Sequence, residues 1–284
     1  MAVRSRSPVE WVWEEVKIAV TAVGAVADNE GSARASAPMV RRIELADPWQ
    51  ALRQGLSDFA AFRGDAVFLC LIYPVAGLVL GWLASGYNVL PLVFPLVAGF
   101  ALIGPLAAVG LNEMSRLSET RDDVTWVDSF AVFRSHAIGK IVVLGLLLML
   151  IFLAWLVVAG LIYDATLGPR PPASLGVFMG EVFGTGAGWT MIVAGVGVGF
   201  LFAVLVLAIG AISFPLLLDR DVRLETAVAT SVRAAAANPV AMAEWGLIVA
   251  AGLVLGSIPF LLGLAIVLPV LGHATWHLYR KLVW

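Results

Sequence analysis

The hydrophobic positions of the chain form long uncharged runs, and short polar stretches separate them. Four runs reach the length of about 20 residues that a helix needs to cross the ~30 Å hydrocarbon layer of a bilayer. They are residues 66–85, 89–111, 141–163 and 189–218. This pattern predicts an all-α fold, a polytopic membrane helix bundle.

The end of the chain allows two interpretations. Residues 246–272 form an uncharged segment. This segment is too short for two full crossings of a bilayer and longer than one crossing needs. Asn238-Pro239 is a good helix start, with Asn as the N-cap and Pro at the first helical position. Helices over 239–257 and 260–279 would then form a final hairpin. That hairpin would bring the total to six transmembrane helices arranged as three hairpins, instead of five spans.

The basic residues favour six spans over five. Eight of the 18 Lys and Arg residues precede residue 66, four lie in 112–140, three in 219–238 and two at 280–281, against Arg170 alone in 164–186. Because basic residues accumulate in cytoplasmic loops, six spans place seventeen of them inside and one outside. Five spans place fifteen basic residues inside and three outside. We therefore expect a multi-pass protein of a bacterial inner (cytoplasmic) membrane with its N-terminus in the cytoplasm.

The chain divides into a cytoplasmic N-terminal segment, residues 1–43, and a membrane domain, residues 44–284. Valines and tryptophans recur at helical spacing over residues 9–26, which predicts an amphipathic helix followed by a linker. This helix would lie on the membrane or pack against its own bundle.

A short pattern recurs ahead of three of the predicted spans. Phe59-Ala-Ala-Phe-Arg63, Phe130-Ala-Val-Phe-Arg134 and the looser Val228–Arg233 each follow an acidic start, at Asp47, Asp123 and Asp221. The acid suits a helix N-terminus and the arginine a C-terminus. We infer three copies of one unit, in which a cytoplasmic amphipathic helix precedes a transmembrane hairpin.

Composition excludes a soluble protein. Hydrophobic residues make up 61% of the chain and charged residues 13%, against roughly 45–50% and about 25% in soluble domains. The net charge of −2 does not suggest nucleic-acid binding. A single cysteine, Cys70, rules out an internal disulfide and any CxxC metal site.

The predicted spans carry no charged residue in their middle, and HExxH, P-loop and GxSxG motifs are absent. Ion-coupled carriers and pumps usually keep ionisable groups at depth. We therefore expect neither catalytic residues nor a cofactor.

His273 and His277 are the candidate metal ligands. They lie four residues apart, so on a helix both imidazoles project from one face and could hold a transition metal or a haem. His136, the third histidine, could join them near the same interface. The competing interpretation is an interfacial belt of Trp, Tyr, His and Arg that contacts lipid headgroups.

Several segments resemble one known family. The chain is similar to a family of predicted bacterial integral membrane proteins of unknown function in Ile212–Arg220, in Ala227–Arg233 with Asn238-Pro239, and above all in Leu268–Arg280. Asp47-Pro48-Trp49 also resembles the usual beginning of that family's sequences. Some members carry a label likening them to a cytochrome c oxidase subunit. The resemblance implies fold and location. Three histidines are too few for a haem–copper centre.

The expected function is that of a multi-pass integral membrane protein without evident catalytic activity, a structural or assembly-type component of a membrane complex. A small-molecule or lipid transporter or channel is the first alternative, and a haem- or metal-binding membrane subunit is the second. The expected partners are membrane lipids and other membrane proteins, not nucleic acid.

Overall fold

The computed structural model describes residues 38–70, 90–92, 94–96, 104–106, 108–259 and 262–284. The predicted all-α fold is confirmed: in this part of the chain the elements are helices, and the one β-type contact is an isolated bridge between Val40 and Val283. The predicted N-terminal helix, and most of the spans predicted over 66–85 and 89–111, lie outside the described residues.

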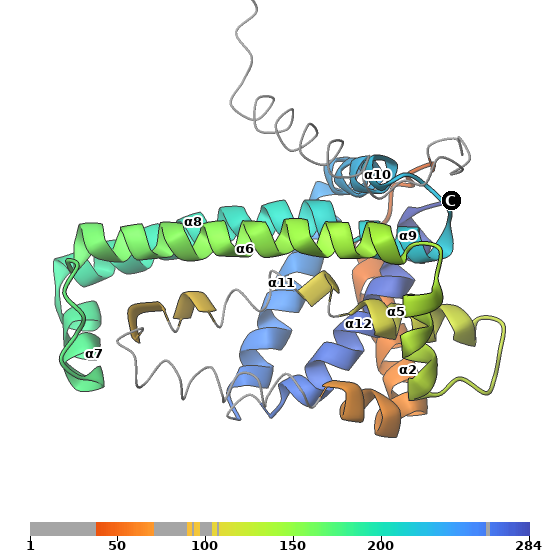
Figure 1. Ribbon diagram of the computed structural model, residues 1–284, viewed down its shortest axis with the longest axis horizontal. Coiled ribbons are helices and arrows are strands. Elements are labelled where there is room, and N and C mark those ends of the chain that lie inside the picture. The colour runs from red at the N-terminus through yellow and green to blue at the C-terminus, as the bar shows by residue number, and fades with distance from the viewer. Residues whose placement is uncertain (1–37, 71–89, 93, 97–103, 107, 260–261) are drawn as a thin grey trace, which may run out of the picture.

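Two long apolar helices run side by side (Figure 1). These are α6, Ile138–Thr166, and α8, Gly186–Gly210, and the short helix α7, Leu175–Gly184, lies at their far end. After a turn, α8 continues into α9, Ser213–Asp219, so the whole apolar segment Gly186–Asp219 has 34 residues. Both segments are long and apolar enough to cross a bilayer, which agrees with the helices predicted over 141–163 and 189–218.

Helix α11, Pro239–Ser257, begins and ends where the sequence predicts. Asn238, however, does not cap it with its side chain. Its Oδ1 accepts a hydrogen bond from the Ile43 backbone N–H at 2.8 Å, and its Nδ2 donates to the Arg41 carbonyl at 3.0 Å. Asn238 therefore ties the segment before the first described helix to the start of α11.

The six-span arrangement is not confirmed. Within the described residues three helices are long and apolar enough to span a membrane: α6, the α8–α9 segment and α11. The predicted last span, 260–279, overlaps helix α12, Leu264–Leu282, which is not among these three helices. The second half of α12 carries two histidines, Arg280 and Lys281. In the view of Figure 1, α11 and α12 also run steeply across α6 and α8 instead of along them.

The three recurrent segments, Phe59–Arg63, Phe130–Arg134 and Val228–Arg233, all occupy helices. The first lies in α2, Ala46–Cys70, the second in the 3₁₀ helix η2, Trp126–Arg134, and the third in α10, Leu224–Ala237. The acidic starts are partly different from those predicted. Asp47 does lie in the first turn of α2, but Asp128 and Thr125 form a capping box on η2 in place of Asp123.

At the third repeat, Glu225 occupies the first turn of α10. Asp221, the acid that the pattern assigns to that start, accepts a hydrogen bond from Lys140 Nζ of α6 at 2.9 Å instead.

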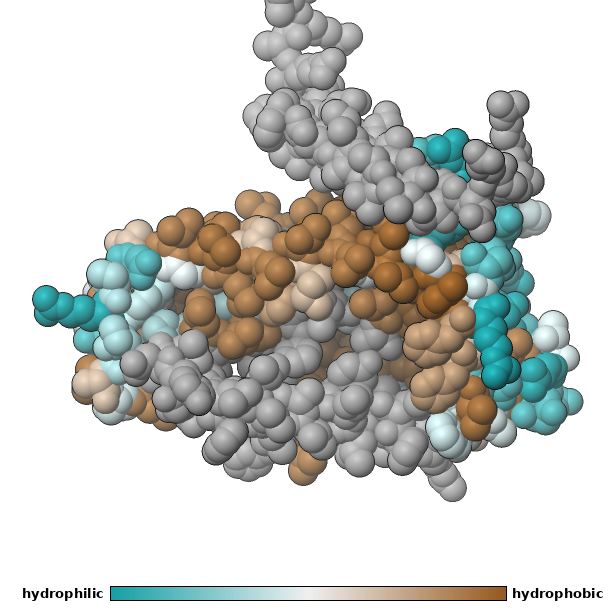
Figure 2. All heavy atoms as spheres, in the orientation of Figure 1, coloured by the Kyte–Doolittle hydropathy of each residue, from teal (hydrophilic) through white to brown (hydrophobic). Residues whose placement is uncertain are grey.

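Apolar side chains cover the surface of the α6–α8 pair, and hydrophilic side chains gather at its two ends (Figure 2). The buried core lies toward one end, where α2, α9, α12 and the short helix α5, Val109–Ser118, meet. Its largest fully buried side chains include Trp245, Trp276, Tyr279, Phe214 and Met114. Helix α12 packs along α2 more extensively than any other described pair of elements does.

Candidate functional site

The polar side chains of the second half of α12 meet acidic and hydroxyl groups from three other parts of the chain. We call this group the polar junction. It comprises Asp47 and Asp58 on α2, Ser115 on α5, Glu119 just after α5, Asp219 at the end of α9, and on α12 His273, Trp276, His277, Tyr279, Arg280 and Lys281.

A chain of hydrogen bonds links the two histidines through Asp58. His277 Nε2 lies 2.9 Å from Asp58 Oδ2, and Ser115 Oγ donates to the same oxygen at 2.6 Å. His273 Nδ1 lies 2.8 Å from Ser115 Oγ. Because the single Ser115 proton goes to the carboxylate, His273 carries its own proton on Nδ1 and donates it to the hydroxyl. The order is therefore His277, Asp58, Ser115, His273.

Burial and hydrogen bonding oppose each other at Asp58. Burial alone would raise the pKa of its carboxyl group, but the hydrogen bonds from His277 and Ser115 outweigh it, so the pKa lies below the usual value. Asp58 is thus ionised at neutral pH. Its charge sits beside a histidine ring, His273, that is completely buried.

The last turns of α12 make a second set of contacts. Trp276 Nε1 donates to Glu119 Oε1 at 2.8 Å, and the Tyr279 hydroxyl donates to Asp219 Oδ2 at 2.5 Å. Lys281 Nζ donates to Asp47 Oδ1 at 2.9 Å. The carboxylates of α2, α9 and the end of α5 therefore converge on one helix, which holds these elements together.

Helix α5 is largely buried although it carries polar and charged residues. Asn112 and Glu113 are 1% and 3% exposed, because α5 packs against both η2 and α12. The i,i+3 pair between Glu113 and Arg116 is present, with Arg116 Nη2 donating to Glu113 Oε1 at 2.7 Å. Both polar atoms of the Asn112 amide are buried without a hydrogen-bond partner in the described part of the chain.

The structure brings two of the three histidines together. His273 and His277 both reach the Asp58 group, whereas His136 is exposed near the start of α6, close enough to Asp221 to lower the pKa of that carboxyl, after the larger effect of Lys140. An interfacial belt does not explain Leu268–Arg280, since His273, Trp276 and Tyr279 are fully buried.

Metal binding by His273 and His277 stays a prediction. Among the described residues, no group of three or more His, Cys, Asp or Glu side chains is placed to hold a metal ion. The imidazole nitrogens that face Asp58 and Ser115 are engaged in hydrogen bonds, whereas His273 Nε2 is buried without a hydrogen-bond partner among the described residues.

Sequence reasoning missed the acidic half of the junction. Asp58, Glu119 and Asp219 are separated from α12 by 219, 157 and 60 residues in the contacts they make. The available signal was their position, because each lies close to one end of an uncharged run. An acid at the edge of a span is a natural partner for the polar tail of another span.

Comparison with known proteins supports the membrane assignment. The model of a family described as predicted integral membrane protein (DUF2189) matches residues 93–219. It agrees with the family that the sequence resembles, and the cytochrome c oxidase-like label is not confirmed. The matched segment contains Ser115, Glu119 and Asp219 of the polar junction. No curated protein and no solved structure matches the chain.

Proposed function

We propose that this integral membrane protein is a structural or assembly-type component of a membrane complex and not an enzyme. The observation that carries the proposal is the polar junction, in which three carboxylates from distant parts of the chain are engaged by α12. Asp58, Glu119 and Asp219 each pair with α12. Groups that bind a substrate or move an ion need a face turned toward a cavity or pathway.

The energetics of the junction favour a scaffold. Hydrogen bonds to charged groups are stronger than those between neutral groups, and a network of them fixes one arrangement of the elements that carry it. The contacts of α12 join it to α2, α5 and α9 at once. An assembly component needs such a fixed arrangement, because its partners must meet the same surface each time.

We further propose that the polar junction lies on the cytoplasmic side of a bacterial inner membrane, together with the N-terminus. The distribution of basic residues supports this orientation. Lys140, at the start of α6, hydrogen-bonds Asp221, which lies just after α9, so these two ends are on one side. Arg170, between α6 and α7, lies beyond the other end of the α6 helix.

The orientation is tested by cysteine accessibility. In a Cys70→Ser background, Arg170→Cys should react with a membrane-impermeant maleimide in intact spheroplasts. Ala236→Cys on α10 should react only after the membrane is opened. Both side chains replaced are exposed, so a difference between them reports the side of the membrane. Labelling of Ala236→Cys in closed spheroplasts would reverse the orientation.

The assembly role is tested by photo-crosslinking at native expression level. Phe133 on η2 is 68% exposed. A photoreactive amino acid at this position samples the end of the protein that carries the polar junction. The same residue at Leu150 on α6, 63% exposed on an apolar helix, is the matched control. We expect one protein adduct of constant mass from Phe133, and lipid alone from Leu150.

Two further probe positions, Trp49 on α2 and Ala236 on α10, make the test decisive because both are exposed at the polar end. If none of the three positions yields a protein adduct while the chain stays folded, the assembly role is wrong.

A further inference from the structure

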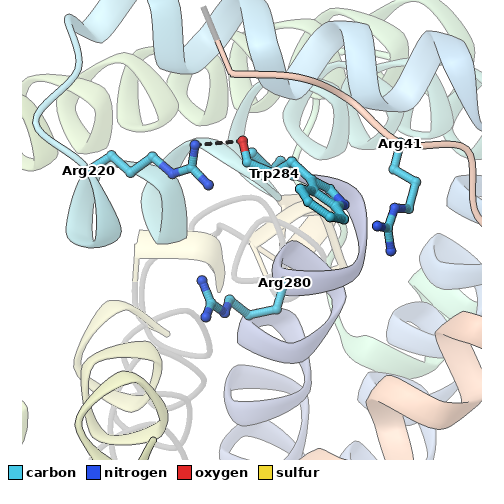
Figure 3. Close-up of a pocket in the computed structure, with 5 residues that line it drawn as sticks. Arg41, Arg220, Arg280 and Trp284 are labelled. Atoms are coloured by element: carbon cyan, nitrogen blue, oxygen red, sulfur yellow. Dashed lines mark hydrogen bonds between the residues drawn. The ribbon is translucent and has the colours of Figure 1, made fainter. Parts of the chain in front are cut away.

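An open hollow of about 350 Å³ lies beside the polar junction and is lined by Arg41, Arg220, Arg280, Val283 and Trp284. Figure 3 shows Arg220 and Arg280 on one side of Trp284 and Arg41 on the other side of its ring. Three arginines that are far apart in the sequence thus share one surface depression.

Backbone pairing holds these arginines in place. The Arg41 N–H donates to the Leu282 carbonyl at 2.8 Å, and the Trp284 N–H donates to the Met39 carbonyl at 3.0 Å. This pairing, with the bridge between Val40 and Val283, fixes the segment before α2 against the residues after α12. Arg220 Nη1 donates to the Trp284 carbonyl oxygen at 2.6 Å. The hollow is therefore a built part of the fold.

Two side-chain carboxylates face Arg220 and Arg280. Asp219 Oδ2 lies 3.4 Å from Arg220 and 3.7 Å from Arg280, and Glu119 Oε2 lies 3.1 Å from Arg280. Each of these two carboxylates also accepts a hydrogen bond from α12, from Tyr279 and from Trp276 respectively. Asp219 and Glu119 therefore partly balance Arg220 and Arg280, and neither carboxylate forms an ion pair with Arg41 among the described residues.

Arg41 is the least engaged of the three arginines. Its guanidinium packs over the Trp284 ring, 4.5 Å from the ring centroid, and it forms no ion pair with a carboxylate among the described residues. It is close enough to Asp47 to contribute to the lowered pKa of that carboxyl, but Lys281 holds Asp47 by a hydrogen bond. Arg41 is thus available to an anion.

The hollow lies at the end of an apolar helical segment that is long enough to cross a membrane. Arg220 directly follows the 34-residue apolar segment that ends at Asp219. Arginine recognises phosphate through two parallel hydrogen bonds, and basic pockets at the end of membrane helices favour anionic headgroups. We propose that this hollow binds a phosphate group, carried by a lipid headgroup or by a soluble phosphate.

Isothermal titration calorimetry on the purified full chain in a non-ionic detergent tests the proposal. The probes are inorganic phosphate and dihexanoyl phosphatidylglycerol. We expect saturable binding that weakens at high salt, about ten-fold weaker in Arg220→Gln and about five-fold weaker in Arg41→Gln, since each removes charge-assisted hydrogen bonds. Arg42→Gln, at an exposed neighbouring position outside the hollow, should bind as wild type does.

The two probes distinguish the sources of the phosphate group. Binding of both probes supports recognition of the phosphate alone, and binding of phosphatidylglycerol alone supports a lipid headgroup. No binding of either probe, or equal binding by Arg41→Gln and Arg42→Gln, overturns the proposal. Should Arg220→Gln fail to fold, Arg41→Gln decides, because the ring contact with Trp284 is all that its guanidinium is seen to make.

Discussion

Replacing Gly55 with alanine is expected to destabilise the protein by about 3 kcal/mol, because the new methyl group would overlap backbone atoms. A Cβ at Gly55 would lie 2.5 Å from the Ala274 nitrogen and 2.6 Å from the Val270 carbonyl oxygen, both on α12. Backbone cannot rotate away as a side chain can. Helices α2 and α12 would therefore have to separate.

The separation would also break the histidine contacts. Asp58 follows Gly55 by three residues on α2, and His273 precedes Ala274 on α12, so the clash falls beside the Asp58–Ser115–His273 hydrogen bonds. We expect a clear drop in the thermal unfolding midpoint of the detergent-solubilised protein, followed by tryptophan fluorescence.

Gly160→Ala is the matched control, because a Cβ at Gly160 on α6 would meet nothing within 4 Å. Its midpoint should stay close to that of the wild type. Equal midpoints for both variants would show that α2 and α12 are not in close contact.

Asp58→Asn is expected to cost about 2–3 kcal/mol at neutral pH. The Asp58 carboxylate accepts from both Ser115 and His277 at one oxygen, and hydrogen bonds to a charged group contribute about 1.5–3 kcal/mol each at most. An asparagine in its place loses the charge and turns one acceptor into a donor. Asp122→Asn, at an exposed position, should leave the unfolding midpoint unchanged.

The contribution of Asp58 to folding stability decreases as the pH is lowered. Its pKa is lower in the folded protein than the usual carboxyl value, so its stabilisation is fully present above about pH 4 and is lost as the pH falls through the folded-state pKa. Other carboxyls with lowered pKa values, Asp47, Asp128 and Asp221, act in the same direction.

We therefore expect the wild-type midpoint to fall in two stages as the pH is lowered. Between about pH 6.5 and pH 4 the loss comes from His273, because burial lowers the pKa of its imidazole to about 4 and protonation favours the unfolded chain. Below about pH 4 the carboxyl groups are protonated and the midpoint falls further. The gap between wild type and Asp58→Asn should narrow over the acidic range, which isolates the contribution of Asp58. A gap that stays constant from pH 7 to pH 3 would mean that Asp58 does not act through its charge.

The apolar helices could be predicted from the sequence because their signal is local. Helix α11 begins at Pro239, where proline costs no hydrogen bond, and ends at Ser257 just before another proline. Helices α6 and α8 follow directly from uninterrupted apolar length. None of these assignments depends on knowing what another part of the chain does.

Helix α12 shows where local reasoning stops. His273 and Trp276 are polar residues at the edge of an apolar run, which headgroup contact explains as well as burial does. Their true surroundings are set by Ser115 and Glu119, and no periodicity within α12 indicates those partners. The pairing of distant acids with one helix is a property of the tertiary structure alone.

The separation in sequence of the junction contacts has a consequence for biogenesis. Asp58 meets His277 across 219 residues, and Lys281 meets Asp47 across 234. A ribosome delivers α12 after every other described helix, so the junction cannot close until translation has passed these residues. Until then Asp58, Glu119 and Asp219 lack the hydrogen bonds that they form with α12. We expect membrane chaperones and proteases to act on nascent chains that have not yet completed α12, because the polar junction is still open in them.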